Sequence, residues 1–175
     1  MQPVKSTREL LITTWAVVGV GLMLLEAIVR MGMRTVRLLR DGEGMSGLAW
    51  VALVLTVLLF CWGEGYLALQ RRFVPHVIQR AEAFGATASG CFTVILAPLH
   101  AMSLLGASRR ALVRAWSGVA LIVLAIFVIR ALPAPWRAIV DAGVTAALTW
   151  GLVALAIAFA RIFPRRTRVS GAPEQ

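Results

Sequence analysis

Charged residues are scarce in this 175-residue chain. They make up 15% of it, whereas about 25% is usual for a soluble domain. Cysteine is also scarce: Cys61 and Cys91 form no Cys-x-x-Cys pair and have no Cys/His spacing of the kind that binds zinc. These absences argue against a soluble domain, a structural zinc site and a thioredoxin-type site. We therefore expect no metal and no cofactor.

Signatures of catalysis are missing as well. The chain has no nucleophile elbow, no Walker loop, no HExxH motif and no rhomboid-like serine–histidine pattern. The formal net charge of +10 would suggest nucleic acid in a soluble protein, but no basic run has the interleaved aromatics that stack on bases. We expect no catalytic residues and no nucleic-acid partner.

Long apolar stretches are what the chain does contain, and 59% of its residues are apolar. A bilayer core about 30 Å thick needs roughly 20 such residues per helix. The pattern predicts an all-α fold in which residues 1–175 form one membrane domain with a basic tail at 161–175. The expected spans are 10–29, 48–69, 86–106, 111–129 and 138–160.

The third stretch is the most polar, and Pro98 removes a backbone donor from it. It either crosses the bilayer, which gives five spans, or enters and returns, which gives four spans plus a re-entrant segment. Two other segments, 30–40 and 75–84, have the pattern of amphipathic helices that lie at the membrane interface. Five spans is the arrangement we expect.

Basic residues fix the expected orientation. With five spans, the side that holds the N-terminus carries seven Lys and Arg residues and the other side carries eleven. With four spans, both termini share the side that carries twelve, against six on the other. Either count places the C-terminal tail in the cytoplasm.

Ionisable residues within or near spans are costly and mark candidate sites. Glu26 precedes Arg30 by one helical turn, and Arg137 precedes Asp141 by the same spacing, so both pairs are expected to form ion pairs. Glu64 lies between two glycines and is expected to join Arg137 and Asp141 in a buried polar cluster that locks helices together, with His100 as a further member. The alternatives are proton transfer or binding of a lipid headgroup.

A stripe of small residues marks the last span. Gly143, Ala147 and Gly151 recur four apart, a spacing that lets another helix approach closely, either in the same chain or in a partner.

Three motifs resemble an uncharacterised family of small bacterial polytopic inner-membrane proteins. The likeness covers roughly residues 60–155 and implies a bacterial inner membrane, but no activity. The motifs are Trp62-Gly63-Glu64-Gly65-Tyr66, Leu96-Ala97-Pro98-Leu99-His100 and Pro135-Trp136-Arg137-Ala138-Ile139-Val140-Asp141-Ala142-Gly143.

Together these features predict a non-catalytic accessory or assembly subunit, with the bilayer and either another membrane protein or a second copy as partners. One alternative is a small proton-coupled transporter whose path is lined by Glu64, His100 and Asp141. Another is an enzyme that modifies lipid headgroups, with Arg71, Glu64 and Asp141 at its site.

Overall fold

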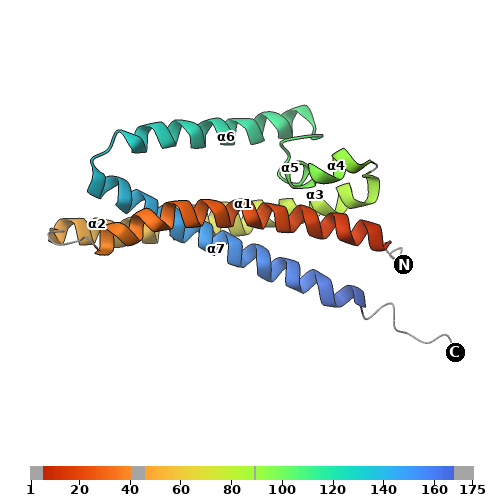
Figure 1. Ribbon diagram of the computed structural model, residues 1–175, viewed down its shortest axis with the longest axis horizontal. Helices are drawn as coiled ribbons and strands as arrows, with labels where there is room; N and C mark the ends of the chain where they lie inside the picture. The colour runs from red at the N-terminus through yellow and green to blue at the C-terminus, as the bar shows by residue number, and fades with distance from the viewer. Residues whose placement is uncertain (1–5, 41–45, 89, 168–175) are drawn as a thin grey trace.

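The computed structural model describes residues 6–40, 46–88 and 90–167, and these residues are helical with no strand among them (Figure 1). The all-α prediction is confirmed. The helices are α1 (Thr7–Arg40), α2 (Gly47–Phe60), the π-helical segment η1 (Cys61–Phe73), α3 (Val74–Thr87), α4 (Cys91–Ile95), α5 (Ala97–Ala101), α6 (Arg109–Arg130) and α7 (Ala134–Thr167). The end of the predicted tail, 168–175, lies outside the described residues.

Four helical stretches in the described part of the chain are long and apolar enough to cross a membrane: Thr7–Arg37, Gly47–Thr87, Arg109–Arg130 and Pro135–Arg161. The expected fifth helix, over 86–106, is absent as a single element. Its residues form α4 and α5, five residues each, and at 1.5 Å per residue such a helix rises only about 7.5 Å. Pro98 stands in the first turn of α5, and Ser103 and Gly106 then adopt positive φ angles of 62° and 61°.

The segment 75–84 was expected to be a short helix of its own at the membrane interface, but it is not separate. It continues from α2 through η1 into α3 as one 41-residue helix. The apolar face of this segment is buried: Val77 and Ala81 are fully buried and Ile78 is 9% exposed. That face packs against α1 in the core of the bundle.

Helix termini follow local sequence. Ser6 and Glu9 form a capping box at the start of α1, in which each side chain accepts a hydrogen bond from the other residue's backbone N–H, at 3.3 and 3.2 Å. Ser46 caps α2 by accepting from the Ala49 N–H. At the end of η1 the Val74 N–H bonds to the Leu69 carbonyl, the wider i→i−5 turn of a π-helix.

The helices pack through small residues. A Cβ added at Gly19 would lie 2.3 Å from Cγ of Pro98, and one added at Gly85 would lie 2.5 Å from Oγ1 of Thr13. The Thr13 hydroxyl also donates to the Ala81 carbonyl at 3.4 Å. These contacts press α3 and α5 against the first half of α1.

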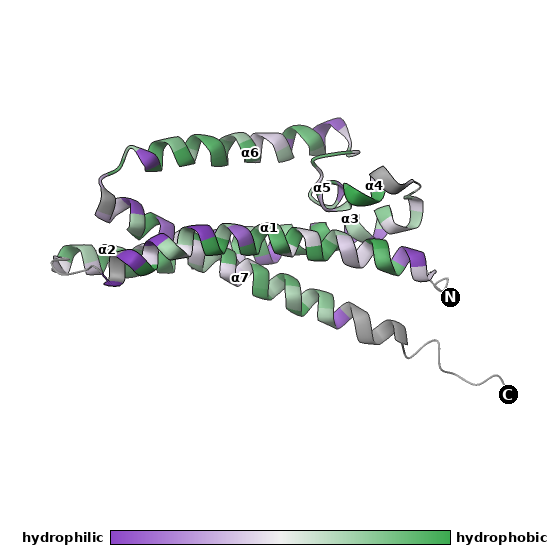
Figure 2. Ribbon diagram, in the orientation of Figure 1, coloured by the Kyte–Doolittle hydropathy of each residue, from purple (hydrophilic) through white to green (hydrophobic). Residues whose placement is uncertain are grey.

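α7 runs antiparallel to α1 and alongside α2 and η1. Its Asp141 meets Arg34, while Gly143, two residues later, lies against Thr56 and Phe60. Measured along the helix axes, Arg34 therefore lies level with the apolar C-terminal end of α2. This offset is visible in Figure 2, where hydrophilic positions lie along the half of α1 that runs beside α2.

α6 differs from the other long helices, since none of its residues is buried and it runs apart from the bundle (Figure 1). Its residues 120–128 are all exposed and all apolar. It is joined to α7 by a short turn at residues 131–133.

Gly85→Ala should lower the free energy of unfolding by about 1–3 kcal/mol, because the methyl group would collide with Thr13 and with the Glu9 carbonyl 3.0 Å away. The measurement is thermal unfolding in mild detergent. Gly63→Ala in the same continuous helix is the control, since a Cβ there meets nothing within 4 Å. Equal melting temperatures for the two variants would contradict the packing described.

Candidate functional site

Asp141 is the buried carboxylate of the bundle. Its residue is 4% exposed, and its Oδ2 lies 3.5 Å from Nη1 of Arg34 on α1. The Arg34 side chain is half exposed, so one end of this ion pair reaches the surface while the other lies between helices. A buried carboxylate is costly unless it is paired, and Arg34 is the ion-pair partner of Asp141.

Close approach of α1 and α7 places these two groups together. Gly32 lies beside Thr145, one turn after Asp141, where an added Cβ would be in ordinary contact with the Thr145 methyl group at 3.5 Å. Segment 30–40, which contains Arg34, was predicted to be an amphipathic helix at the membrane interface, so no contact with α7 was expected.

Several polar atoms around this pair are buried without a hydrogen-bond partner among the described residues. They are Oδ2 of Asp141, Oγ1 of Thr35, Oγ1 of Thr145 and Nε of Arg137. The two hydroxyls and the guanidinium can donate, and the carboxylate can accept. Arg34, Thr35, Arg137, Asp141 and Thr145 are therefore a cluster of polar residues on neighbouring parts of α1 and α7.

Arg137 does not pair with Asp141, contrary to the prediction. Its Nη2 donates to the carbonyl of Arg130 at 3.0 Å, at the C-terminal end of α6. A cation is favourable at that position because the last carbonyls of a helix carry partial negative charge. The other expected pair is present: Arg30 and Glu26 form an ion pair one turn apart on α1.

Glu64 is not part of this cluster. Its side chain is exposed on η1, whereas its neighbour Gly65 faces α7 at Ala147 and Trp150. Ala147 and Trp150 follow Asp141 by six and nine residues, or about 9 and 13 Å along α7. The predicted lock of Glu64, Arg137 and Asp141 is thus replaced by one built around Arg34.

His100 lies at the other end of the bundle. Its ring stacks on Phe84 with centroids 4.4 Å apart, and its Nδ1 is 3.1 Å from the Leu96 carbonyl. The adjacent Pro98 touches α1 at Gly19, fifteen residues from Arg34, or about 22 Å along the helix. The structure does not bring Glu64, His100 and Asp141 into one path. Arg71, considered for a lipid-modifying site, lies over the Tyr66 ring at 5.9 Å.

A second polar cluster, absent from the sequence predictions, joins α3 to the loop after α5. Arg80 donates from Nε to the His100 carbonyl at 3.0 Å and from Nη2 toward the Leu105 and Gly106 carbonyls at 3.5 and 3.4 Å. His76, one turn before Arg80, is 2.7 Å from the hydroxyl of buried Ser103. Irregular backbone at membrane depth needs such partners. Both residues lie in segment 75–84, which was predicted to be an amphipathic helix at the membrane interface.

The small-residue stripe of α7 lies buried within the chain. A Cβ at Gly143 would be 2.8 Å from Cγ2 of Thr56, and one at Gly151 would be 2.6 Å from Cδ1 of Leu69. Ala147 lies between them and is 2% exposed. Trp150 reinforces this contact by donating from Nε1 to Oε1 of Gln70 at 2.6 Å. This face of α7 is thus used for packing against α2 and η1.

Comparisons with protein-family models, with curated proteins and with solved structures found no match to the chain. Among the described residues, no three His, Cys, Asp or Glu side chains are placed to hold a metal ion together.

Arg34→Gln should destabilise the protein by about 1–3 kcal/mol, because it leaves the Asp141 carboxylate buried without its ion pair. Asp141→Asn should cost less, since the half-exposed Arg34 can turn toward the surface. In the Arg34→Gln background, Asp141→Asn should restore stability.

Thermal unfolding of the wild type, both single variants and the double variant forms a complete cycle. Arg37→Gln serves as the control, because Arg37 is exposed on α1 one turn beyond Arg34. Strictly additive losses in the double variant would mean that Arg34 and Asp141 are not coupled.

Proposed function

We propose that the chain is a multi-pass membrane protein that acts as a non-catalytic accessory or assembly subunit. In this role it presents α6 to the helices of another membrane protein or of a second copy. The observation that carries the proposal is that all residues of α6 lie outside the core, whereas α1, α3 and α7 each bury a face.

Lipid tails are as apolar as leucine, so helices associate in a bilayer through close packing and polar contacts. Along its length α6 is neither packed closely against its own bundle nor buried by it. Its surface nevertheless carries small residues, Ala111, Ala115 and Gly118, at spacings of four and three, and a Cβ at Gly118 would meet nothing within 4 Å. A second helix can therefore approach its backbone closely at this point.

Two attachments hold α6 in place at its ends. The loop before it is bound by Arg80, and the Arg130 carbonyl at its end is bound by Arg137. A helix fixed at both ends and uncovered between them is suited to receive a partner, since little conformational freedom is lost on binding.

A photo-crosslinking amino acid at Gly118 should capture a membrane protein in intact cells, and the same amino acid at Val54 should not, although Val54 is also exposed on an apolar helix. Mass spectrometry identifies the adduct. Gly118→Leu should then abolish co-purification of the captured protein, because its side chain fills the approach surface. Equal capture at both positions, or co-purification that persists in Gly118→Leu, would contradict the proposal.

For topology we propose four crossings, with residues 86–106 entering the membrane region without traversing it and both termini in the cytoplasm of a bacterial inner membrane. The count of twelve basic residues against six supports this orientation. Four crossings place the arginines of 30–40 outside the cytoplasm, which the positive-inside rule disfavours. The pairing of Arg30 with Glu26 and of Arg34 with Asp141 reduces that cost. The family resemblance of residues 60–155 supports the bacterial setting.

Alkaline phosphatase, which is active only outside the cytoplasm, reports topology directly. Fusions after residue 132, in the turn between α6 and α7, should be active, whereas fusions at either terminus should be inactive. Green fluorescent protein at the same sites provides the inverse control. An active phosphatase at the N-terminus, with an inactive one at the C-terminus, would instead indicate five crossings.

A further inference from the structure

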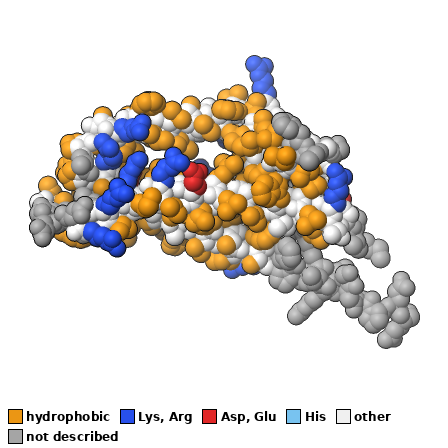
Figure 3. Space-filling model, in the orientation of Figure 1, with side chains coloured by type: hydrophobic (Ala, Val, Ile, Leu, Met, Phe, Trp, Pro, Cys, Tyr) orange, Lys and Arg blue, Asp and Glu red, His pale blue; other side chains and the backbone are white. Residues whose placement is uncertain are grey.

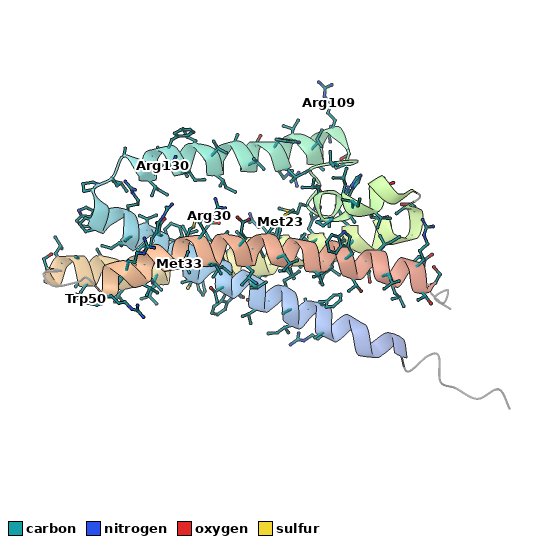
Figure 4. The ribbon with its side chains drawn as sticks, viewed as in Figure 1. Met23, Arg30, Met33, Trp50, Arg109 and Arg130 are labelled. Carbon is teal, nitrogen blue, oxygen red and sulfur yellow. The ribbon has the colours of Figure 1, made fainter. Side chains whose placement is uncertain are left out.

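Arg137 has one donor engaged with α6 and another that is buried and unused. Its Nη2 donates to the Arg130 carbonyl at 3.0 Å, at the C-terminal end of α6. Its Nε is buried and has no hydrogen-bond partner among the described residues. Figure 4 shows Arg130 at the end of α6 from which the chain turns into α7. The guanidinium that holds α6 therefore keeps a second donor available for another acceptor.

Asp141 offers such an acceptor one turn further along α7. It follows Arg137 by four residues in a continuous helix, a spacing that places the two Cβ atoms about 5–6 Å apart on one face. Its Oδ2 is buried without a hydrogen bond, because Arg34 lies 3.5 Å away, beyond the roughly 2.7–3.2 Å of an N–H···O bond. A buried donor and a buried carboxylate oxygen thus lie one turn apart on α7, each without a hydrogen bond.

Two arginines can therefore serve this one carboxylate. Arg34 reaches Asp141 from α1, and its half-exposed side chain can return to water. Arg137 would gain a charge-assisted hydrogen bond to Asp141, which is roughly twice as strong as a bond between neutral groups. To do so it must leave the Arg130 carbonyl, and that bond is what holds the end of α6. Pairing at Asp141 and attachment of α6 are consequently linked through a single side chain.

We propose that Arg137 is a two-position switch that couples the end of α6 to the contact between α1 and α7. In the first position Arg137 holds Arg130 while Arg34 holds Asp141, as the structure shows. In the second position Arg137 binds Asp141, which frees both Arg34 and the end of α6. None of the residues of α6, all of which the structure describes, is buried, so little else retains that end. Figure 3 shows basic side chains gathered over this end of the molecule.

The switch gives α6 a way to signal to the bundle, a use that rests on the proposed function of α6 as the docking helix. A partner that draws the end of α6 outward removes the carbonyl from Arg137 and sends the guanidinium to Asp141. The pairing of α1 with α7 is thereby weakened. Coupling of this kind is reciprocal, so a change at Arg34 must alter the end of α6 to the same extent. The chain can therefore be tested without any partner.

Hydrogen exchange of the purified protein in mild detergent, followed by mass spectrometry, reads the two ends of α6 separately. The backbone amides of Ala131 and Leu132 bond to carbonyls in the last turn of α6, and their exchange reports release of that end. The amide of Leu112 bonds to the Ser108 carbonyl at the start of α6 and is the internal control.

Arg34→Gln should raise exchange at Ala131 and Leu132 by roughly fivefold or more, since a hydrogen bond of about this worth is lost when Asp141 draws Arg137 away. Exchange at the start of α6 should not change. Stability still falls in this variant, because Asp141 regains a partner only by removing one from α6. Adding Asp141→Asn should return exchange to the wild-type rate, because no carboxylate then competes for Arg137. An equal rise at both ends of α6, a rise that survives Asp141→Asn, or no rise at all would overturn the switch.

Arg34→Lys keeps the test decisive if Arg34→Gln does not fold. Lysine retains the charge but lacks the planar fork of arginine, so it should hold Asp141 less well and raise exchange at the end of α6 by a smaller factor. In the Arg137→Gln background that end is already released, and Arg34→Lys should add nothing. The same effect with and without Arg137 would overturn the switch. Docking on α6 is tested separately by crosslinking from Gly118, so the two proposals fail independently.

Discussion

Close approach of helix backbones at small residues is the constraint on which the rest of this structure depends. In a bilayer, apolar surface gains little by leaving lipid, so helices must be held by dense packing and polar contacts. Gly19, Gly85 and Gly143 each allow a neighbour to come nearer than a Cβ would permit. α1 and α7 also pack together, where Arg34 meets Asp141, and α3 lies against α1 on the side where Arg80 binds the loop that follows α5.

The two polar clusters have complementary roles. The cluster around Asp141 joins α1 to α7, and the cluster around Arg80 joins α3 to the irregular segment near His100. Each cluster also holds one end of α6. Arg137 binds the carbonyl of Arg130, the last residue of α6, and Arg80 binds the loop that precedes its first residue. α6 is therefore positioned by hydrogen bonds at its ends, while its length stays open to lipid and to other helices.

Local features of the sequence predicted much of this fold. The apolar runs gave the long helices, Pro98 marked the broken segment, and the spacing of Glu26 and Arg30 gave their ion pair. Continuity through Pro75 was missed because proline normally begins a helix, whereas here the wide turns of η1 lead directly into it. The partner of Asp141 was missed because sequence spacing reveals neighbours on one helix, and Arg34 approaches from another.

The axial offset between α1 and α2 has a consequence for how the molecule meets a bilayer. Arg34 lies level with Thr56 and Phe60, so the arginine-bearing half of one helix stands beside the apolar half of its neighbour. The apolar runs of α1 and of the helix Gly47–Thr87 are therefore offset along their axes and do not lie level with each other. In a bilayer such an offset is accommodated by tilting of the helices or by local deformation of the lipid.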